Sequence, residues 1–138
     1  MTALVNVRLC HNATVNEAAR NKEYLMGLVS TGDNGQIISH NIKNIIANRQ
    51  AIAEQNKYPE PDMKKIARFE HNVKTCFESI TSRLKRLGAK SDEITKIISD
   101  INSNDLQSVT LAVLKLMAAR NPGMYQRQYD TVLAQHQR

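Results

Sequence analysis

Residues 62–88 read DMKKIARFEHNVKTCFESITSRLKRLG and contain the strongest apolar pattern in the chain. Apolar side chains recur there at the a and d positions of a seven-residue repeat that only Glu70 interrupts: Met63, Ile66, Val73, Phe77, Ile80, Leu84 and Leu87. Side chains at this spacing share one face of an α-helix. The pattern predicts a helix from about Asp62 to Leu87, which Gly88 ends.

Two further apolar residues of this stretch, Phe69 and Cys76, are expected on the side of the helix opposite the a/d seam. A two-stranded coiled coil would leave Phe69 in water. The sequence therefore favours a central helix of a bundle, packed on two faces.

Helical patterns also precede this stretch. Thr14 and Glu17 form a capping box that predicts a first helix over residues 15–29. Residues 30–35 are rich in turn formers and are expected to form a loop, in which Gly32 or Gly35 takes a positive φ. An isoleucine-rich face predicts a second helix over residues 36–56, which the two prolines that follow it end.

After Gly88 the sequence predicts three more helices. Acidic residues near Ser91 mark the start of one that runs to about Ile101. A short polar turn follows, and Asp105 is expected to cap a largely buried helix over residues 105–120. Residues 121–123 end that helix, and 124–138 are expected to form a weaker last one. Four of its side chains should face inward: Tyr125, Tyr129, Val132 and Leu133.

The chain has 138 residues, which is the length of one ordinary domain. We therefore expect an all-α fold, a single-domain bundle of five or six helices over residues 13–138. Residues 1–12 form an N-terminal arm, in which apolar and polar residues alternate with the period of a strand. Two arrangements stay open for this arm: a strap over the bundle, or pairing with the same arm of a second subunit in a homodimer.

The longest segments without Asp, Glu, Lys or Arg have nine residues, far fewer than the roughly 20 that a spanning helix needs. The first residues have neither the basic region nor the apolar region of a signal peptide. We expect a cytoplasmic protein with no transmembrane segment, and signal-free secretion stays open. The 13 Asn and 12 Ile residues are typical of a low-GC microbial or viral genome.

The positive charge is concentrated in one part of the chain. The net charge is +6, and residues 61–90 carry +5 of it, with eight Lys and Arg against three Asp and Glu. Most of these cations form two clusters near the two ends of the central helix. We take the following residues as candidate binding residues for an anionic partner: Lys64, Lys65, Arg68, Arg83, Lys85, Arg86 and Lys90.

No catalytic, metal or cofactor motif stands out. The four histidines are scattered, and the two cysteines, Cys10 and Cys76, have no metal-binding spacing and are expected to be buried or half-buried thiols. Glu70 is expected to be a structural carboxylate that reaches solvent or pairs with a nearby cation. Three methionines are expected to fill the core: Met63, Met117 and Met124.

These observations predict a non-enzymatic interaction protein of the adaptor, regulator or effector type. It would bind an acidic macromolecular partner through the basic central helix. If the partner is a protein, exposed apolar residues such as Tyr58 or Tyr125 should contribute to the interface. The alternative is a nucleic-acid-binding protein that contacts phosphates with the same basic residues. An enzyme with an unrecognised site ranks third.

Overall fold

The computed structural model describes residues 26–27, 29–30 and 32–136, and the elements within them are all α-helices. The helices are α2 (Asp33–Gln55), α3 (Met63–Arg86), α4 (Ser91–Asn102), α5 (Leu106–Arg120) and α6 (Pro122–His136). The predicted all-α class is therefore confirmed for this part of the chain. The N-terminal arm and most of the expected first helix lie outside the described residues.

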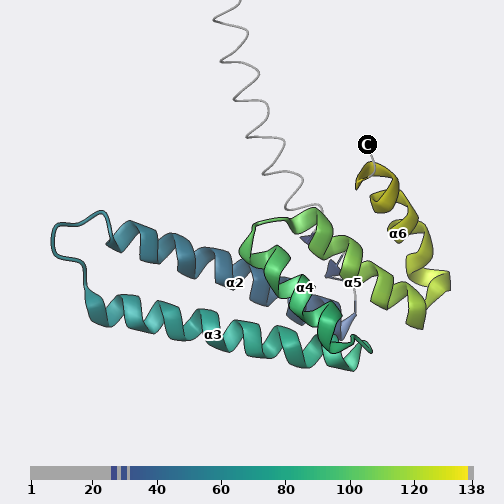
Figure 1. The fold of residues 1–138 in the computed structure, drawn as a ribbon, viewed down its shortest axis with the longest axis horizontal. Coiled ribbons are helices and arrows are strands. Elements are labelled where there is room, and N and C mark those ends of the chain that lie inside the picture. Colours follow the sequence, from purple (N-terminus) through teal and green to yellow (C-terminus); the bar gives the residue numbers. More distant parts are fainter. Residues whose placement is uncertain (1–25, 28, 31, 137–138) are drawn as a thin grey trace, which may run out of the picture.

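The two longest helices, α2 and α3, form an antiparallel hairpin (Figure 1). Residues 56–62 connect them at one end of the molecule. The shorter helices α4 and α5 lie over the opposite end of the hairpin, and α6 packs against α5. The other end, made of the last half of α2, residues 56–62 and the first half of α3, extends beyond α4. We call it the distal end.

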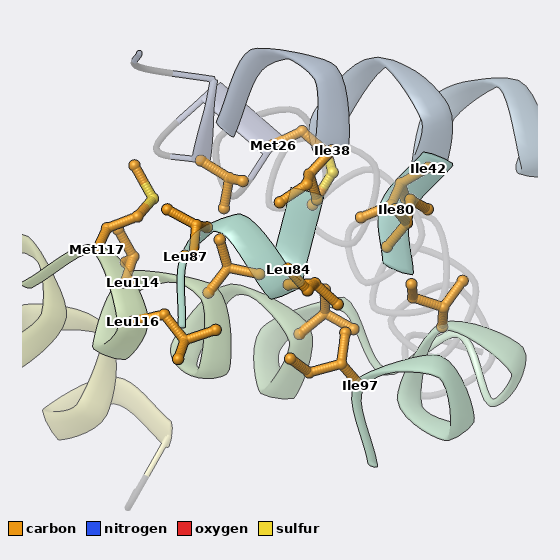
Figure 2. Close-up of a cluster of buried hydrophobic side chains, with 14 of the residues drawn as sticks. Met26, Ile38, Ile42, Ile80, Leu84, Leu87, Ile97, Leu114, Leu116 and Met117 are labelled. Atoms are coloured by element: carbon orange, nitrogen blue, oxygen red, sulfur yellow. The ribbon is translucent and has the colours of Figure 1, made fainter. Parts of the chain in front are cut away.

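The hydrophobic core lies where α4 and α5 meet the hairpin. Figure 2 shows side chains from four helices converging there, among them Ile42 of α2, Leu84 of α3, Ile97 of α4 and Leu114 of α5. All four are at most 1% exposed. None of the buried side chains of this cluster comes from residues 46–75. The main core therefore lies at one end of the hairpin, and Ile66 of α3, only 6% exposed, is buried at the distal end outside this cluster.

A row of hydrogen bonds runs along the α2–α3 interface. Four carboxamides spaced seven residues apart on α2 reach α3 or the residue that caps it, and we call this row the amide ladder. Its bonds are Arg83 Nη1 to Asn34 Oδ1 (3.4 Å), Asn41 Nδ2 to Ser79 Oγ (3.0 Å), Asn72 Nδ2 to Asn48 Oδ1 (3.2 Å) and Asp62 N to Gln55 Oε1 (3.1 Å). A seven-residue spacing keeps the four groups on one side of α2. The ladder fixes the register of the two helices over the whole hairpin.

A second contact ties α2 to both α3 and α4. The guanidinium of Arg49 lies 5.5 Å from the ring centroid of Phe77, and its Nη2 donates to Asn102 Oδ1 at 2.6 Å. Asn102 is the last residue of α4. Arg49 therefore marks the place where α4 ends and the distal end of the hairpin begins.

The start of α2 corrects one expectation. Residues 33–35 are helical and not part of a loop, and Gly32 alone takes the positive φ, at 80°. Gly35 lies against the backbone carbonyl of Val29, so closely that a Cβ atom would collide with it. The glycine at position 35 is thus required by a close approach of two backbone segments and not by a turn.

The described residues before α2 are anchored to it. Met26 and Val29 are helical and fully buried, in agreement with the end of the expected first helix. The Ser30 hydroxyl donates to Ser39 Oγ at 2.9 Å, and Ser39 Oγ donates to the Met26 carbonyl at 3.3 Å. These bonds satisfy the hydroxyl of Ser39, which is only 2% exposed.

The other helix boundaries lie within a few residues of those predicted. Asp62 caps α3, and its Oδ1 accepts from the backbone N of Lys64 and of Lys65. Asp105 caps α5 as expected, through Oδ1 to Ser108 N (3.2 Å) and Oδ2 to Ser108 Oγ (2.7 Å). The last helix begins earlier than predicted, at Pro122, because proline is favoured in a first helical turn.

Two expectations about α3 and the core are wrong. Cys76 belongs to the same buried cluster as Ile80, one turn away, and does not lie on the opposite side of the helix. Phe69 is half-buried. Met117 does fill the core, but Met63 and Met124 are 67% and 58% exposed because no other helix covers them. The a/d seam of α3 is thus covered by α4 and α5 only in its second half.

Because α4 and α5 cover only the second half of the a/d seam of α3, truncating a residue in each half should lower the free energy of unfolding by different amounts. Leu84→Ala is expected to lower the free energy of unfolding by about 3 kcal/mol, because Leu84 is fully buried and its loss leaves a cavity. Met63→Ala, the matched control, should change it by less than about 0.5 kcal/mol. Urea denaturation followed by circular dichroism measures both. Equal losses would contradict a main core that lies at one end of the hairpin.

The amide ladder predicts that Asn41→Ala costs about 1 kcal/mol of stability, because Ser79 then loses its partner in α2. The control is Asn44→Ala on the same helix, whose side-chain amide reaches only His40. It should cost less than about 0.5 kcal/mol. Chemical denaturation measures the free energy of unfolding of both variants. Equal losses in the two variants would show that the amide ladder does not contribute to stability.

The cap of α5 predicts a pH-dependent loss. Hydrogen bonds from Ser108 lower the pKa of Asp105 below its ordinary value of 3.8, so the folded state favours the carboxylate. The stabilisation is fully present above pH 3.8 and is lost as the pH falls through the lower folded pKa. Asp105→Ala is therefore expected to cost about 1 kcal/mol at pH 7, and the difference from wild type should shrink in acid. Urea titrations at a series of pH values test this, with the exposed Asp130→Ala as a control. A cost that stayed constant down to strongly acidic pH would rule out the carboxylate as its source.

Candidate binding surface on helix α3

The structure places the seven candidate binding residues in two groups at opposite ends of α3. Lys64, Lys65 and Arg68 lie on the first turns of the helix, at the distal end, and all three are exposed. We call them the distal group. Arg68 and Arg86 lie about five helical turns apart, so the two groups are separated by about 27 Å along the helix axis. The predicted residues therefore form two clusters, in agreement with the expectation from the sequence.

The distal group is not neutralised by the acid nearest to it in sequence. The carboxylate of Asp62 is engaged with the backbone N–H groups of Lys64 and Lys65, and not with their ammonium groups. A capping carboxylate of this kind stabilises the start of the helix. The three cationic side chains remain exposed to solvent.

The second cluster separates into residues with different roles. Arg83 is half-buried and donates to Asn34 of α2, so it takes part in the packing of the hairpin. Lys85 and Arg86 are exposed on the last turn of α3, and Lys90 is exposed directly before α4. Of the four predicted residues, these three are available to a partner.

A further cation, Arg120, joins the second cluster from the end of α5. Its Nη1 donates to the Arg86 carbonyl at 2.9 Å, and the same nitrogen lies near Gly88, which has a φ of 88°. The backbone carbonyls at a helix end attract cations. Sequence reasoning missed Arg120 because no local pattern shows that the ends of α3 and α5 meet. We call Lys85, Arg86, Lys90 and Arg120 the junction group.

Ion pairs are few in the part of the chain that the structure describes. They join Lys57 to Glu54 at 3.2 Å and Lys96 to Asp100 at 2.6 Å. Neither involves a cation of α3 or of the junction group. Within the described residues, the positive charge of α3 is therefore not balanced by paired carboxylates.

The remaining candidate residues lie apart from one another. Glu70 is exposed and thus reaches solvent, one of the two outcomes expected for it. Cys76 is buried as expected, and burial raises the pKa of its thiol. Cys10 lies outside the described residues. No group of three His, Cys, Asp or Glu side chains among the described residues could hold a metal ion.

The two tyrosines proposed for a protein interface have different positions. Tyr58 is 55% exposed in the connection between α2 and α3, close in sequence to the distal group. Tyr125 is 7% exposed and packs in the core, because α6 turns this residue toward α5. Of these two tyrosines, Tyr58 is the one that could contribute apolar area to a partner at this surface.

A cleft of about 360 Å³ lies beside Arg49, between the second half of α2 and the turn after α4. Arg49 is the one ionisable side chain that lines it, and its guanidinium is bonded to Asn102. Acid–base catalysis needs ionisable groups that act together at one place. The cleft gathers no such set.

Comparisons with protein-family models, with curated proteins and with solved structures find no match to this chain. The surface of α3 must therefore be interpreted from its own geometry. In the described residues, no helix has the length and the apolar character needed to cross a membrane.

Proposed function

We propose that this chain is a non-enzymatic binding protein that docks an acidic partner protein on the basic face of α3. One observation carries the proposal: the exposed cations of α3 and of the junction group have no ion-pair partner among the described residues. Clustered, unbalanced charge attracts partners of the opposite sign and increases their rate of association.

The packing of α3 supports a role in binding a partner protein. The core holds the second half of α3 and the amide ladder pairs the first half with α2, so the cations of the junction group lie beside the more rigid part of the helix. A rigid support reduces the entropy that is lost when a partner binds. Exposed Tyr58 adds apolar area beside the distal group, which suits a protein partner.

The cleft beside Arg49 is lined by a single ionisable residue and gives no support to a catalytic site there. The choice between a protein partner and a nucleic acid therefore depends on how each would match the positive charge of this surface. An acidic protein and a nucleic acid both carry negative charge, and the experiment must distinguish them.

Fluorescence anisotropy with three labelled probes tests the proposal: a polyglutamate peptide, a DNA duplex and a single-stranded RNA. We expect wild type to bind the acidic peptide, more weakly at about 200 mM than at 50 mM salt. Changing Lys64, Lys65 and Arg68 together to Glu should weaken this binding at least tenfold, that is by about 1.4 kcal/mol or more. The matched control changes Lys43, Lys115 and Arg127 to Glu, three exposed cations on other helices with the same total charge change. It should retain most of the affinity.

Each other outcome decides against the proposal. Equal losses in the two triple variants would show an effect of net charge and not of a surface on α3. Tighter, steeply salt-dependent binding of the duplex or the RNA, lost in the α3 variant, would assign the surface to nucleic acid instead. No binding of any probe at the lower salt concentration would overturn the proposed function.

A further inference from the structure

A continuous row of side chains along α3 contains neither a carboxylate nor an apolar residue. Its successive residues are three or four positions apart, in the order four, three, four, four, three and four, which keeps them on one side of the helix. We call this row the basic stripe, and it consists of Lys64, Arg68, His71, Thr75, Ser79, Ser82 and Arg86. All members are exposed except Ser79, which is half-buried. Of the two carboxylates of α3, Glu70 lies on another side of the helix, and exposed Glu78 lies at the edge of the row, beside its middle.

The charge along the stripe has a definite order. Lys64 and Arg68 are cationic at one end, and Arg86, joined by Arg120 of α5, is cationic at the other. The four residues between them are His71 and three residues with hydroxyl side chains, so none is Lys, Arg, Asp or Glu. Two of their hydroxyls are already engaged, because Thr75 Oγ1 donates to the His71 carbonyl and Ser79 Oγ accepts from Asn41. The stripe is positive, neutral and positive in turn.

The spacing of the cations matches the repeat of an α-helix. Arg68 and Arg86 are separated by a whole number of helical turns, about five, so both side chains leave α3 in the same direction. A second helix laid along α3 has the same rise and repeat. Carboxylates about five turns apart on that helix would reach both cationic ends together.

We propose that the partner binds through an acidic α-helix that lies along the basic stripe, with its carboxylates in two patches about five turns apart. This inference rests on the proposed function and specifies the docking element of the partner. Short side chains in the middle of the stripe, at Thr75 and Ser82, let the neutral centre of such a helix approach α3 closely.

The charge order favours such a helix over a polynucleotide. A nucleic acid carries one phosphate charge at every nucleotide, so it would place as much negative charge over the middle of the stripe as over its ends. The residues in the middle of the stripe include no Lys or Arg to contact those phosphates, and Glu78 at its edge would repel them. The exposed Lys74 lies one turn before Glu78 and further round the helix from the stripe. A protein helix can carry its acids at two places and remain neutral between them, in agreement with the stripe.

Labelled helical peptides of equal composition test the proposal with the full chain. All have an alanine and glutamine background and four glutamates. In the split peptide the glutamates form two pairs about five helical turns apart, and in the central peptide they lie together in the middle. A third peptide has the split pattern with two prolines that break the helix. We expect the split peptide to bind about tenfold more tightly than either of the others.

Variants of the chain locate the two contacts. Arg86→Glu and the double variant Lys64→Glu with Arg68→Glu should each weaken binding of the split peptide and remove its advantage over the central peptide. Lys43→Glu, an exposed lysine on α2, is the matched control and should preserve the advantage.

The outcomes separate this inference from the proposed function. Equal affinity for the split and central peptides, or undiminished binding of the proline peptide, would overturn the helix inference while acidic peptides still bind. Failure of every acidic peptide and of polyglutamate would overturn both. Competition by duplex DNA at concentrations below those of the split peptide would show that phosphates occupy the stripe.

Discussion

The antiparallel pairing of α2 and α3 is the constraint on which the rest of the structure depends. Buried isoleucines of α2 and the a/d seam of α3 supply the apolar part, and the amide ladder fixes the register with one hydrogen-bonding carboxamide every second turn. The two helices have 23 and 24 residues and reach about 35 Å, whereas the 12 residues of α4 reach about 18 Å. The covering helices are therefore too short for the hairpin, and a distal end without a third layer follows directly.

The same pairing sorts the charge of α3. The apolar side packs against the other helices, one edge carries the residues that join the amide ladder, and the remaining side displays cations and short hydroxyl side chains. Arg83 shows how sharp this division is, because it is as basic as Arg86 and yet turns toward Asn34 in the helix interface. A count of positive residues along the chain includes both, and only the packing distinguishes them.

Local patterns allowed the helices to be predicted because periodicity and capping residues are properties of neighbouring positions. Asp105 caps the helix that the sequence assigned to it, α3 starts directly after Asp62, near the predicted position, and the isoleucine-rich face of α2 is buried in its first half. The failures concern contacts between distant segments. Met63 has the right spacing for the core but no helix above it, Gly35 faces the carbonyl of Val29, and Arg120 reaches α3 from α5. None of these can be inferred from spacing along one helix.

The uneven cover of the hairpin also affects how the molecule opens. Backbone amides exchange with solvent at rates set by the free energy of the smallest opening that exposes them. Helix turns held only by their pairing partner open at less cost than turns packed in the core, so amide protection should decrease along α2 and α3 from the junction with α4 toward residues 56–62. A ligand bound to both cationic ends of the basic stripe would connect the distal end of the hairpin with the part that packs in the core. Its binding energy would then oppose the local opening of the distal end, and the hairpin would exchange more nearly as a single cooperative unit.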